Sequence, residues 1–277
     1  MRTCIEQTRN LMTIRIALEI VMYTVAGYAE RFGVYNPMRP YLANALGAQE
    51  TTMFQMIAAY AMFANGGERV EPTLVDRVQD RWGRTIYRHD QRSCTDCNID
   101  QLPSGEAPQI VSNRERVMDA ITAYQLTSMM EGVVQRGSGT GVRLPVPVAG
   151  KTGTTQAARD AWFIGFTGDY VTGIWMGNDD NTPLKGVTGG GLPAEIWHDV
   201  MVKVSAGTPA VPLPKADPSE WRNNIAQQGF GGETYSTAPQ GNVSAWTPPA
   251  PVPQQEKEPD IAERILMEVL GVITGKN

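Results

Sequence analysis

The residues best suited to chemistry lie in one short segment, Lys151-Thr152-Gly153-Thr154-Thr155, which follows Val148-Ala149-Gly150. A lysine beside hydroxyls and a glycine on an extended segment can hold a carboxylate. Lysine supplies the charge, threonine donates hydrogen bonds, and glycine lets another backbone come close. Taken alone, the segment is also compatible with a solvated surface strand, so it indicates a carboxylate site only in combination with other residues.

A phosphate-binding loop is the competing interpretation of Gly150-Lys151-Thr152, because the loop pattern G-x-x-x-x-G-K-[ST] ends in this way. That pattern needs glycine at position 145, where this sequence has Pro145. The loop also leads into a helix, whereas Gly153 and the threonines favour continued extension. The pattern therefore excludes a phosphate loop. A second glycine-rich stretch, residues 136–141, is predicted to be a flexible turn before the lysine-bearing strand.

Composition restricts the remaining possibilities. The formal net charge of −5 argues against a nucleic-acid partner, because no basic stripe is available to neutralise phosphates. No apolar run reaches the roughly 20 residues that a membrane span needs, since Arg15 and Glu19 interrupt the best candidate. There is no signal-peptide pattern either, so any anchor or targeting segment is expected outside this chain.

The three cysteines do not make a metal site. Cys94 and Cys97 form a single C-x-x-C in a polar loop, and Cys4 stands alone. A zinc site needs four ligands, and neither a second such pair nor paired histidines supply them. We therefore predict no metal and no cofactor. Two readings of the C-x-x-C stay open: a loop disulfide, or two small loop residues without a chemical role.

The first part of the chain is predicted to be mainly helical. Apolar residues at helical spacing predict one long amphipathic helix over residues 10–30 and a second helix over 52–64. Residues 73–78 and 85–87 predict a hairpin. The pattern Ser112-x-x-Glu115 resembles a capping box and predicts a third helix over about 118–135.

From residue 145 onward the sequence predicts mainly strands. Residues 145–155 are extended by composition, and residues 162–167 and 170–177 predict two strands joined by a Gly168-Asp169 turn. A helix is predicted over 194–204. This order predicts an α+β domain over residues 1–206. The proline-rich residues 207–260 predict a disordered tail, and residues 261–272 a possible short docking helix.

Several segments together resemble class A penicillin-binding proteins over most of residues 1–206. Lys151 to Thr154 are similar to the K-T-G-T box of that family, and Thr8-Arg9-Asn10 resembles its S-x-N box. Further similar segments are Glu131-Gly132-Val133-Val134-Gln135-Arg136-Gly137, Asp160-Ala161-Trp162-Phe163, and Thr188-Gly189-Gly190 leading to Ile196-Trp197. The resemblance implies the α+β fold of serine β-lactamases and DD-peptidases.

The resemblance also implies a reaction, the cross-linking of peptidoglycan stem peptides through an acyl-serine intermediate. Lys151 and Thr152 would position the substrate carboxylate, with Thr154 adding a hydrogen bond. Gly153 and Thr155 would belong to the strand that pairs with the extended substrate. Asn10 would hold the substrate amide, and Thr8 would stand in place of a proton-shuttling serine.

The implied ligands are D-Ala-D-Ala ends of stem peptides and β-lactams, which mimic that dipeptide. The implied location is the periplasmic face of the bacterial inner membrane, with a membrane-anchored parent protein and cell-wall synthesis proteins as possible partners. All these expectations depend on one geometric prediction. Lys151 and Asn10 should face a common groove.

Two departures from the family pattern matter. Thr8 replaces serine, and its extra methyl group restricts the side-chain rotamer. No serine is followed by lysine three positions later, so the acylated residue of the family has no counterpart in this sequence. We therefore expect Met1 to fall within a longer reading frame or to begin a truncated one. We also expect one sheet edge to lack its strand and this chain alone not to acylate.

Two alternative functions stay open. One is a DD-carboxypeptidase or β-lactamase-type hydrolase, in which water replaces the amine as acceptor. The other is a non-catalytic module that keeps the penicillin-binding fold as a scaffold.

Overall fold

The computed structural model describes residues 1–95, 109–111 and 113–215. The predicted docking helix at 261–272 and most of the predicted tail lie outside these residues. The described residues divide into two units: residues 1–72 with 91–95, 109–111 and 113–215, and Thr73–Asp90. Each unit is described by itself below.

The second unit contains the predicted hairpin. Strand β1 (Arg77–Gln79) pairs antiparallel with β2 (Thr85–Arg88). The turn is held by Asp80, whose carboxylate oxygen Oδ1 accepts hydrogen bonds from the backbone amides of Trp82 (3.0 Å) and Arg84 (2.9 Å). The hairpin prediction is confirmed, although the first strand begins later than the expected residue 73.

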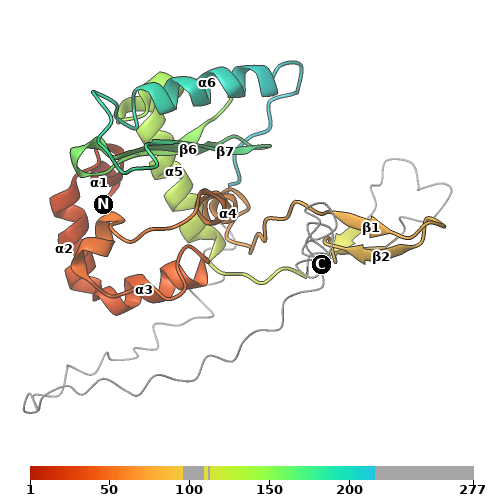
Figure 1. Ribbon diagram of the computed structural model, residues 1–277. Coiled ribbons are helices and arrows are strands. Elements are labelled where there is room, and N and C mark those ends of the chain that lie inside the picture. The colour runs from red at the N-terminus through yellow and green to blue at the C-terminus, as the bar shows by residue number, and fades with distance from the viewer. Residues whose placement is uncertain (96–108, 112, 216–277) are drawn as a thin grey trace, which may run out of the picture. The chain divides into compact units, whose positions relative to one another are not determined.

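The first unit is built around a three-stranded antiparallel sheet in the order β5-β6-β7 (Figure 1). The strands are β5 (Ala149–Thr154), β6 (Asp160–Phe166) and β7 (Val171–Gly177). The predicted tight turn between β6 and β7 is confirmed, because Thr167 N donates to Tyr170 O at 2.9 Å. In the part of the chain that the structure describes, β5 and β7 each have one edge without a strand partner.

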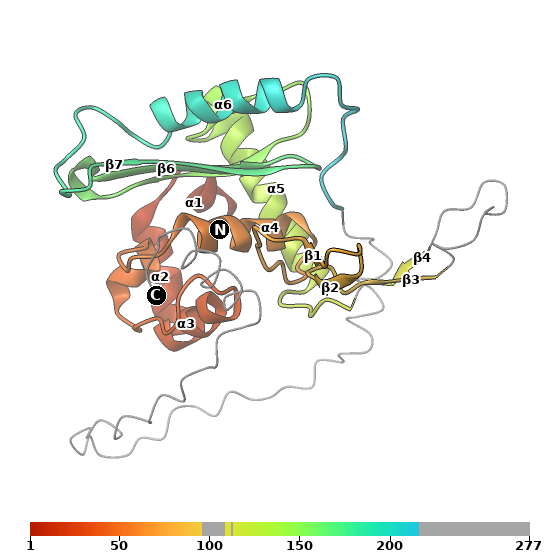
Figure 2. The ribbon, with the colours of Figure 1, turned by 45° about the vertical axis from the view of Figure 1, so that its right-hand side comes forward.

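One face of this sheet packs against α6 (Leu192–Val204), which confirms the predicted helix near 194–204 (Figures 1 and 2). Successive residues of a strand point to opposite faces, so Ala161, Phe163 and Gly165 share the face toward α6. Phe163 and Trp197 are fully buried, and their rings meet edge to face at 5.3 Å. This face forms a closed apolar core.

The opposite face packs against α4 (Met53–Ala64). Helix α5 (Ala120–Arg136) runs past β5, with Met130 in the cluster on this face and Val134 in the cluster toward α6. The predicted helix at 52–64 is confirmed. Its N-terminus is fixed by a capping box in which the Thr52 hydroxyl accepts a hydrogen bond from Gln55 N at 3.2 Å. Phe166 and Ala149 join Met130 of α5 in a buried cluster at one end of this face.

The N-terminal helices differ from the prediction. Instead of one helix over 10–30, the chain forms α1 (Arg2–Glu6), α2 (Asn10–Ile20) and α3 (Met22–Arg31). The break falls at Val21, where φ is 67°, and α2 and α3 are bent by 97°. The bend lets Ala17 of α2 and Ala26 of α3 enter the same buried cluster, beside the 3₁₀ helix η1 (Leu42–Leu46). A straight helix would separate them along its axis.

The bent pair is also the only feature of the described ranges that resembles a membrane span. No single helix among them is both long and apolar enough to cross a bilayer. Together α2 and α3 reach the required length and composition, but with the bend between them.

The predicted capping box before α5 is wrong. The helix begins at Ala120, and Asp119 is its N-cap, with Oδ1 accepting from Ile121 N at 2.9 Å. Glu115 lies before the helix and pairs instead with Arg69 Nε at 2.7 Å, because this long-range contact competes with local capping. Ser112 lies outside the described residues.

The polar loop predicted around the cysteines begins with a strand. Strand β3 (Ser93–Thr95) pairs antiparallel with β4 (Gln109–Val111), which the sequence did not predict. Cys94 in β3 is disulfide-bonded, and Cys4 is free and buried. Cys97 lies outside the described residues, so the disulfide with Cys94 stays a prediction.

Candidate active site

The site is organised by the free edge of β5. Lys151 pairs in register with Ile164 and therefore lies on the face toward α4, whereas Thr152 lies on the face toward α6. The Lys151 side chain bends around the strand edge, where its Nζ donates to the Thr152 carbonyl at 2.9 Å and lies 3.5 Å from Thr152 Oγ1. An edge strand allows this contact because no neighbouring strand blocks the way.

Thr8 meets the lysine at this edge. Lys151 Nζ donates a hydrogen bond to Thr8 Oγ1 at 2.7 Å, across 143 residues of sequence. Thr8 connects α1 and α2 with φ of 51°, a left-handed conformation that costs a β-branched residue about 1–2 kcal/mol. The loop is closed by Arg9 N, which donates to Cys4 O at 2.9 Å. The fold thus holds a strained backbone at the point where the hydroxyl reaches the lysine.

A residue that the sequence did not single out completes this group. Ser138 Oγ lies 2.7 Å from Thr152 Oγ1 and 3.4 Å from Thr8 Oγ1. Four polar atoms therefore form a ring, which we call the hydroxyl ring: Lys151 Nζ and the hydroxyl oxygens of Thr8, Ser138 and Thr152. The stretch 136–141, predicted to be only a flexible turn, supplies a side chain to the site and continues into the 3₁₀ helix η2 (Thr140–Val142).

The other predicted site residues, Asn10, Thr154 and Thr155, differ in their hydrogen bonding. Asn10 begins α2 with an exposed side chain that makes no hydrogen bond within residues 1–95, 109–111 and 113–215. The Thr154 hydroxyl already accepts from Gly189 N at 3.0 Å. The Thr155 hydroxyl accepts from Asp160 N at 2.8 Å and so closes the connection between β5 and β6, which contains the 3₁₀ helix η3 (Gln156–Ala158).

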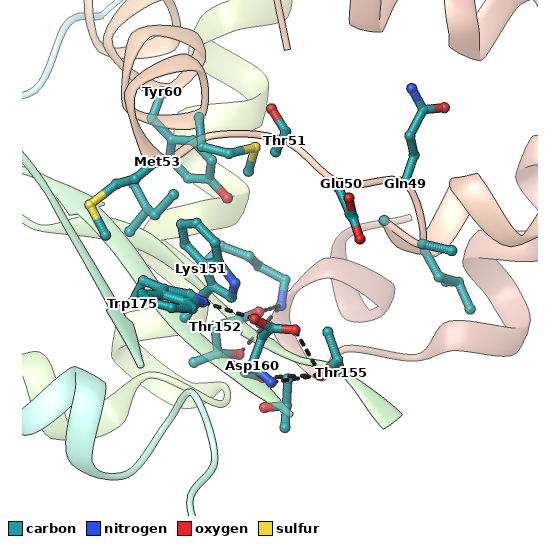
Figure 3. Close-up of a pocket in the computed structure, with 18 of the residues that line it drawn as sticks. Gln49, Glu50, Thr51, Met53, Tyr60, Lys151, Thr152, Thr155, Asp160 and Trp175 are labelled. Carbon is teal, nitrogen blue, oxygen red and sulfur yellow. Dashed lines mark hydrogen bonds between the residues drawn. The ribbon is translucent and has the colours of Figure 1, made fainter. Parts of the chain in front are cut away.

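A cleft of about 600 Å³ opens beside the lysine, on the α4 face of the sheet (Figure 3). One wall comes from the strands, and the other from residues 46–51 and the first turns of α4. The lining combines apolar side chains with the hydroxyls and amides of β5 and with the carboxylates of Glu50 and Asp160. Its larger side chains are Tyr35, Met53, Met56, Tyr60, Trp162, Ile164 and Trp175. Lys151, Thr152, Gly153, Thr154 and Thr155 all line the cleft, whereas Thr8, Asn10 and Ser138 do not. The prediction that Lys151 and Asn10 face a common groove is therefore not confirmed by this cleft.

Burial gives the site its electrostatic character. Desolvation lowers the pKa of Lys151 from 10.5 to about 8, and raises the pKa of Tyr60 to about 12. Within the described residues no carboxylate lies close enough to Lys151 to form an ion pair. A partly desolvated cation without a counter-ion is suited to bind an anion.

Comparison with known proteins fits this geometry. A family model described as the penicillin binding protein transpeptidase domain matches residues 1–202. The chain belongs to this transpeptidase family. Penicillin-binding protein 1A of Rickettsia prowazekii is 38% identical over 221 residues, which are 78% of this chain and 28% of the relative. The protein of the same name from Pseudomonas aeruginosa is 29% identical over 230 residues.

The transpeptidase-family chain thus spans 28% of the length of each of these two relatives. Among solved structures, penicillin-binding protein 1A from Haemophilus influenzae aligns with a TM-score of 0.62 and 26% identity, covering 77% of this chain and 35% of that one. PonA1 from Mycobacterium tuberculosis, with a TM-score of 0.63 and 22% identity, has the same fold. The predicted family and α+β penicillin-binding fold are confirmed.

One glycine-rich segment that resembles the transpeptidase family now has a structural explanation. Residues 188–190 pack against β5 and β6 so closely that a Cβ on Gly189 would lie 2.4 Å from the carbonyl oxygens of Gly153 and Trp162. Glycine is therefore required at position 189 for this loop to support the lysine-bearing strand.

Proposed function

We propose that this chain recognises the carboxylate end of a peptidoglycan stem peptide within a D,D-transpeptidase site. The observation that carries the proposal is the position of Lys151 Nζ, which lies beside the hydroxyls of Thr8 and Thr152 at the free edge of β5. A lysine without a counter-ion next to hydroxyl donors is a carboxylate site by its chemistry.

The free strand edge suggests how the peptide binds. An extended peptide can pair with β5 as an added strand, which places its backbone in register with Gly153 and its end at the hydroxyl ring. The Thr154 hydroxyl accepts from Gly189 N, which leaves its own proton free to donate to the peptide. Asn10 does not line the cleft beside Lys151, so its proposed role in holding the substrate amide rests on the family resemblance alone.

The proposed reaction of a complete site is acyl transfer. A serine hydroxyl attacks the carbonyl of the penultimate D-alanine, and the serine proton goes to the departing D-alanine amine. The amine of a second stem peptide then takes the acyl group, and its proton returns to the serine oxygen. Thr8, hydrogen-bonded to Lys151, is the proposed group for passing these protons. We place this reaction at the periplasmic face of the bacterial inner membrane, alongside other cell-wall synthesis proteins.

The missing S-x-x-K nucleophile limits the chemistry that this chain can do by itself. The sequence contains no serine with lysine three positions later. We therefore propose that the chain binds carboxylate ligands reversibly and is not acylated. A β-lactam, whose carboxylate mimics that of the dipeptide, should bind at the same place without a covalent bond.

Equilibrium binding of two matched probes tests this proposal. N-acetyl-D-alanyl-D-alanine carries the carboxylate, and its C-terminal amide does not. We expect the carboxylate probe to bind at least about tenfold more tightly, a difference of about 1.4 kcal/mol, because charge-assisted hydrogen bonds are the strong ones. Lys151→Met should remove the difference, whereas Lys185→Met, which changes an exposed loop lysine, should leave it unchanged.

Equal affinity for the two probes in the unmodified chain would refute the carboxylate site. Incubation with a fluorescent penicillin, followed by a denaturing gel, tests the second part. A labelled band that survives boiling would show that the chain acylates by itself.

A further inference from the structure

We propose that Ser138 is a further carboxylate-binding residue of this site, and that the Glu6–Arg136 ion pair positions both Ser138 and Thr8. The inference rests on the proposed function, because it concerns the same ligand. It begins from the hydroxyl ring, in which Ser138 Oγ lies 2.7 Å from Thr152 Oγ1 and within 3.4 Å of Thr8 Oγ1. The Ser138 side chain is exposed, so a ligand at the strand edge can reach it.

The chemistry of hydroxyl groups supports this assignment. Each hydroxyl has one proton and two acceptor lone pairs, and its proton rotates to suit its partner. Without a ligand, Ser138 and Thr152 satisfy each other. A carboxylate offers only acceptors, so both hydroxyls can turn their protons toward its two oxygens. Two donors that are 2.7 Å apart can bind the two oxygens side by side, with Lys151 supplying the charge.

The position of Ser138 is fixed from one side by Glu6. Glu6 is the last residue of α1, is only 5% exposed, and accepts from Ser138 N through its backbone oxygen at 3.1 Å. Its carboxylate accepts a bidentate pair from Arg136, with Nε at 3.0 Å and Nη2 on the second oxygen. Arg2 adds a weaker contact at 3.7 Å. Glu6 thus connects to Ser138 through its backbone and to Arg136 through its side chain.

This arrangement couples the two hydroxyls that flank the lysine. Thr8 lies two residues after Glu6, and Ser138 lies two residues after Arg136, the last residue of α5. Holding Glu6 against Arg136 therefore brings the Thr8 segment and the Ser138 segment together. Gln7 Nε2 also donates to the Arg136 carbonyl at 3.4 Å, which adds a contact between the two segments. Such a pair fixes the register of two segments that are 130 residues apart in sequence.

Glycines make the space that Glu6 occupies. A Cβ on Gly132 would lie 2.1 Å from Glu6 Oε1, and a Cβ on Gly137 would lie 2.2 Å from the Glu6 carbonyl oxygen. On the other side of Ser138, a Cβ on Gly190 would lie 2.5 Å from the Ser138 carbonyl oxygen. The segment 131–137 is therefore shaped to receive Glu6, and Ser138 is held between Glu6 and Gly190.

The test uses the full chain and the same two probes. We expect Ser138→Ala to weaken binding of N-acetyl-D-alanyl-D-alanine about tenfold, because it removes one hydrogen bond to a charged group, and to leave the amide probe unchanged. Ser138→Thr keeps the hydroxyl and should retain affinity within about threefold. Unchanged carboxylate binding by Ser138→Ala, or an equal loss for both probes, would overturn the assignment.

The positioning role of the Glu6–Arg136 ion pair is tested by separate variants. Glu6→Gln should weaken carboxylate binding about fivefold and leave the amide probe unchanged, since the hydroxyls lose their alignment with the lysine but the cleft remains. The matched control is Glu115→Gln, which breaks the exposed Glu115–Arg69 pair in the same unit and should leave both affinities unchanged. Arg136→Lys, which keeps the charge but not the bidentate geometry, answers the same question if Glu6→Gln does not fold.

The outcomes separate the two proposals. A wild-type chain that does not prefer the carboxylate probe refutes the proposed function and this inference with it. A wild-type preference that Ser138→Ala leaves intact refutes the Ser138 assignment alone. Variants of Glu6 or Arg136 that lower only the melting temperature, with the ratio of the two affinities unchanged, refute the positioning role.

Discussion

The two faces of the three-stranded sheet both carry aromatic side chains but differ in how far these are buried. Toward α6, Phe163 and Trp197 are both 0% exposed and pack edge to face at 5.3 Å. Toward α4, Trp162 and Trp175 lie 6.3 Å apart in a tilted arrangement, and Trp175 is 39% exposed along the cleft. Alternation along β6 assigns neighbouring residues to a filled face and to a face that is packed at its Phe166 end but hollow beside Trp162, which we call the hollow face.

The comparison shows how the fold divides stability from binding. The filled face buries large aromatic side chains, which are the strongest source of stabilisation available to a domain. The hollow face and its edge hold features that cost stability: a desolvated lysine and a threonine with positive φ. A rigid packed layer lets a site with such costs keep its geometry.

The largest effect should come from breaking the filled face. Trp197→Ala should destabilise the domain by about 4 kcal/mol, because a fully buried tryptophan leaves a cavity that its neighbours cannot fill. Trp175→Ala is the matched change on the hollow face and should cost no more than about 1.5 kcal/mol, since its side chain is partly in water. Urea unfolding followed by circular dichroism measures both, and similar losses would contradict the comparison.

The next effect concerns the loop that supports β5. Gly189→Ala should cost about 2 kcal/mol, because the added Cβ meets two backbone oxygens at 2.4 Å, which cannot move as a flexible side chain would. Gly141→Ala adds the same methyl group where nothing lies within 4 Å, and should change stability by less than about 0.5 kcal/mol. The free energy of unfolding checks both; a tolerated Gly189→Ala would show that this loop does not constrain the strand.

Carboxylate binding at the hollow face should depend on pH. Lys151, with a pKa of about 8, is mostly charged at pH 7 and mostly neutral at pH 9. Carboxylate binding that depends on this charge should therefore weaken about tenfold between pH 7 and pH 9. Calorimetric titration of N-acetyl-D-alanyl-D-alanine measures the change, with the amide probe and Lys151→Met as flat controls. Affinity that stays constant to pH 10 would contradict the depressed pKa.

The smallest expected effect tests the backbone strain at Thr8, which lies at the sheet edge. Thr8→Gly should raise the free energy of unfolding by about 0.5–1 kcal/mol, since glycine adopts positive φ without steric cost, while carboxylate binding weakens with loss of the hydroxyl. Thr24→Gly, in the exposed surface of α3, should instead lower stability by a few tenths of a kcal/mol. If both substitutions destabilise equally, Thr8 is not strained.

The sequence by itself predicted the elements whose signal is local. The turn residues Gly168-Asp169 and the alternating residues around them predicted β6 and β7, and the apolar spacing near Trp197 predicted α6. The K-T-G-T segment predicted the lysine-bearing strand and, with the other segments, the fold. Periodicity and turn chemistry work at short range, so these features were available from neighbouring residues alone.

Only the tertiary structure decided which distant residues meet. The bend at Val21 follows from Ala17 and Ala26 sharing one cluster, which the helical period through residues 10–30 does not encode. Glu115 pairs with Arg69 while Asp119 caps α5, and the Ser138 amide donates to the Glu6 carbonyl. Within the hydroxyl ring, Lys151 donates to a hydroxyl that lies 143 residues away in sequence. These contacts between distant residues are set by the packing of α1 against α5 and of α5 against β5, which no local pattern of residues specifies.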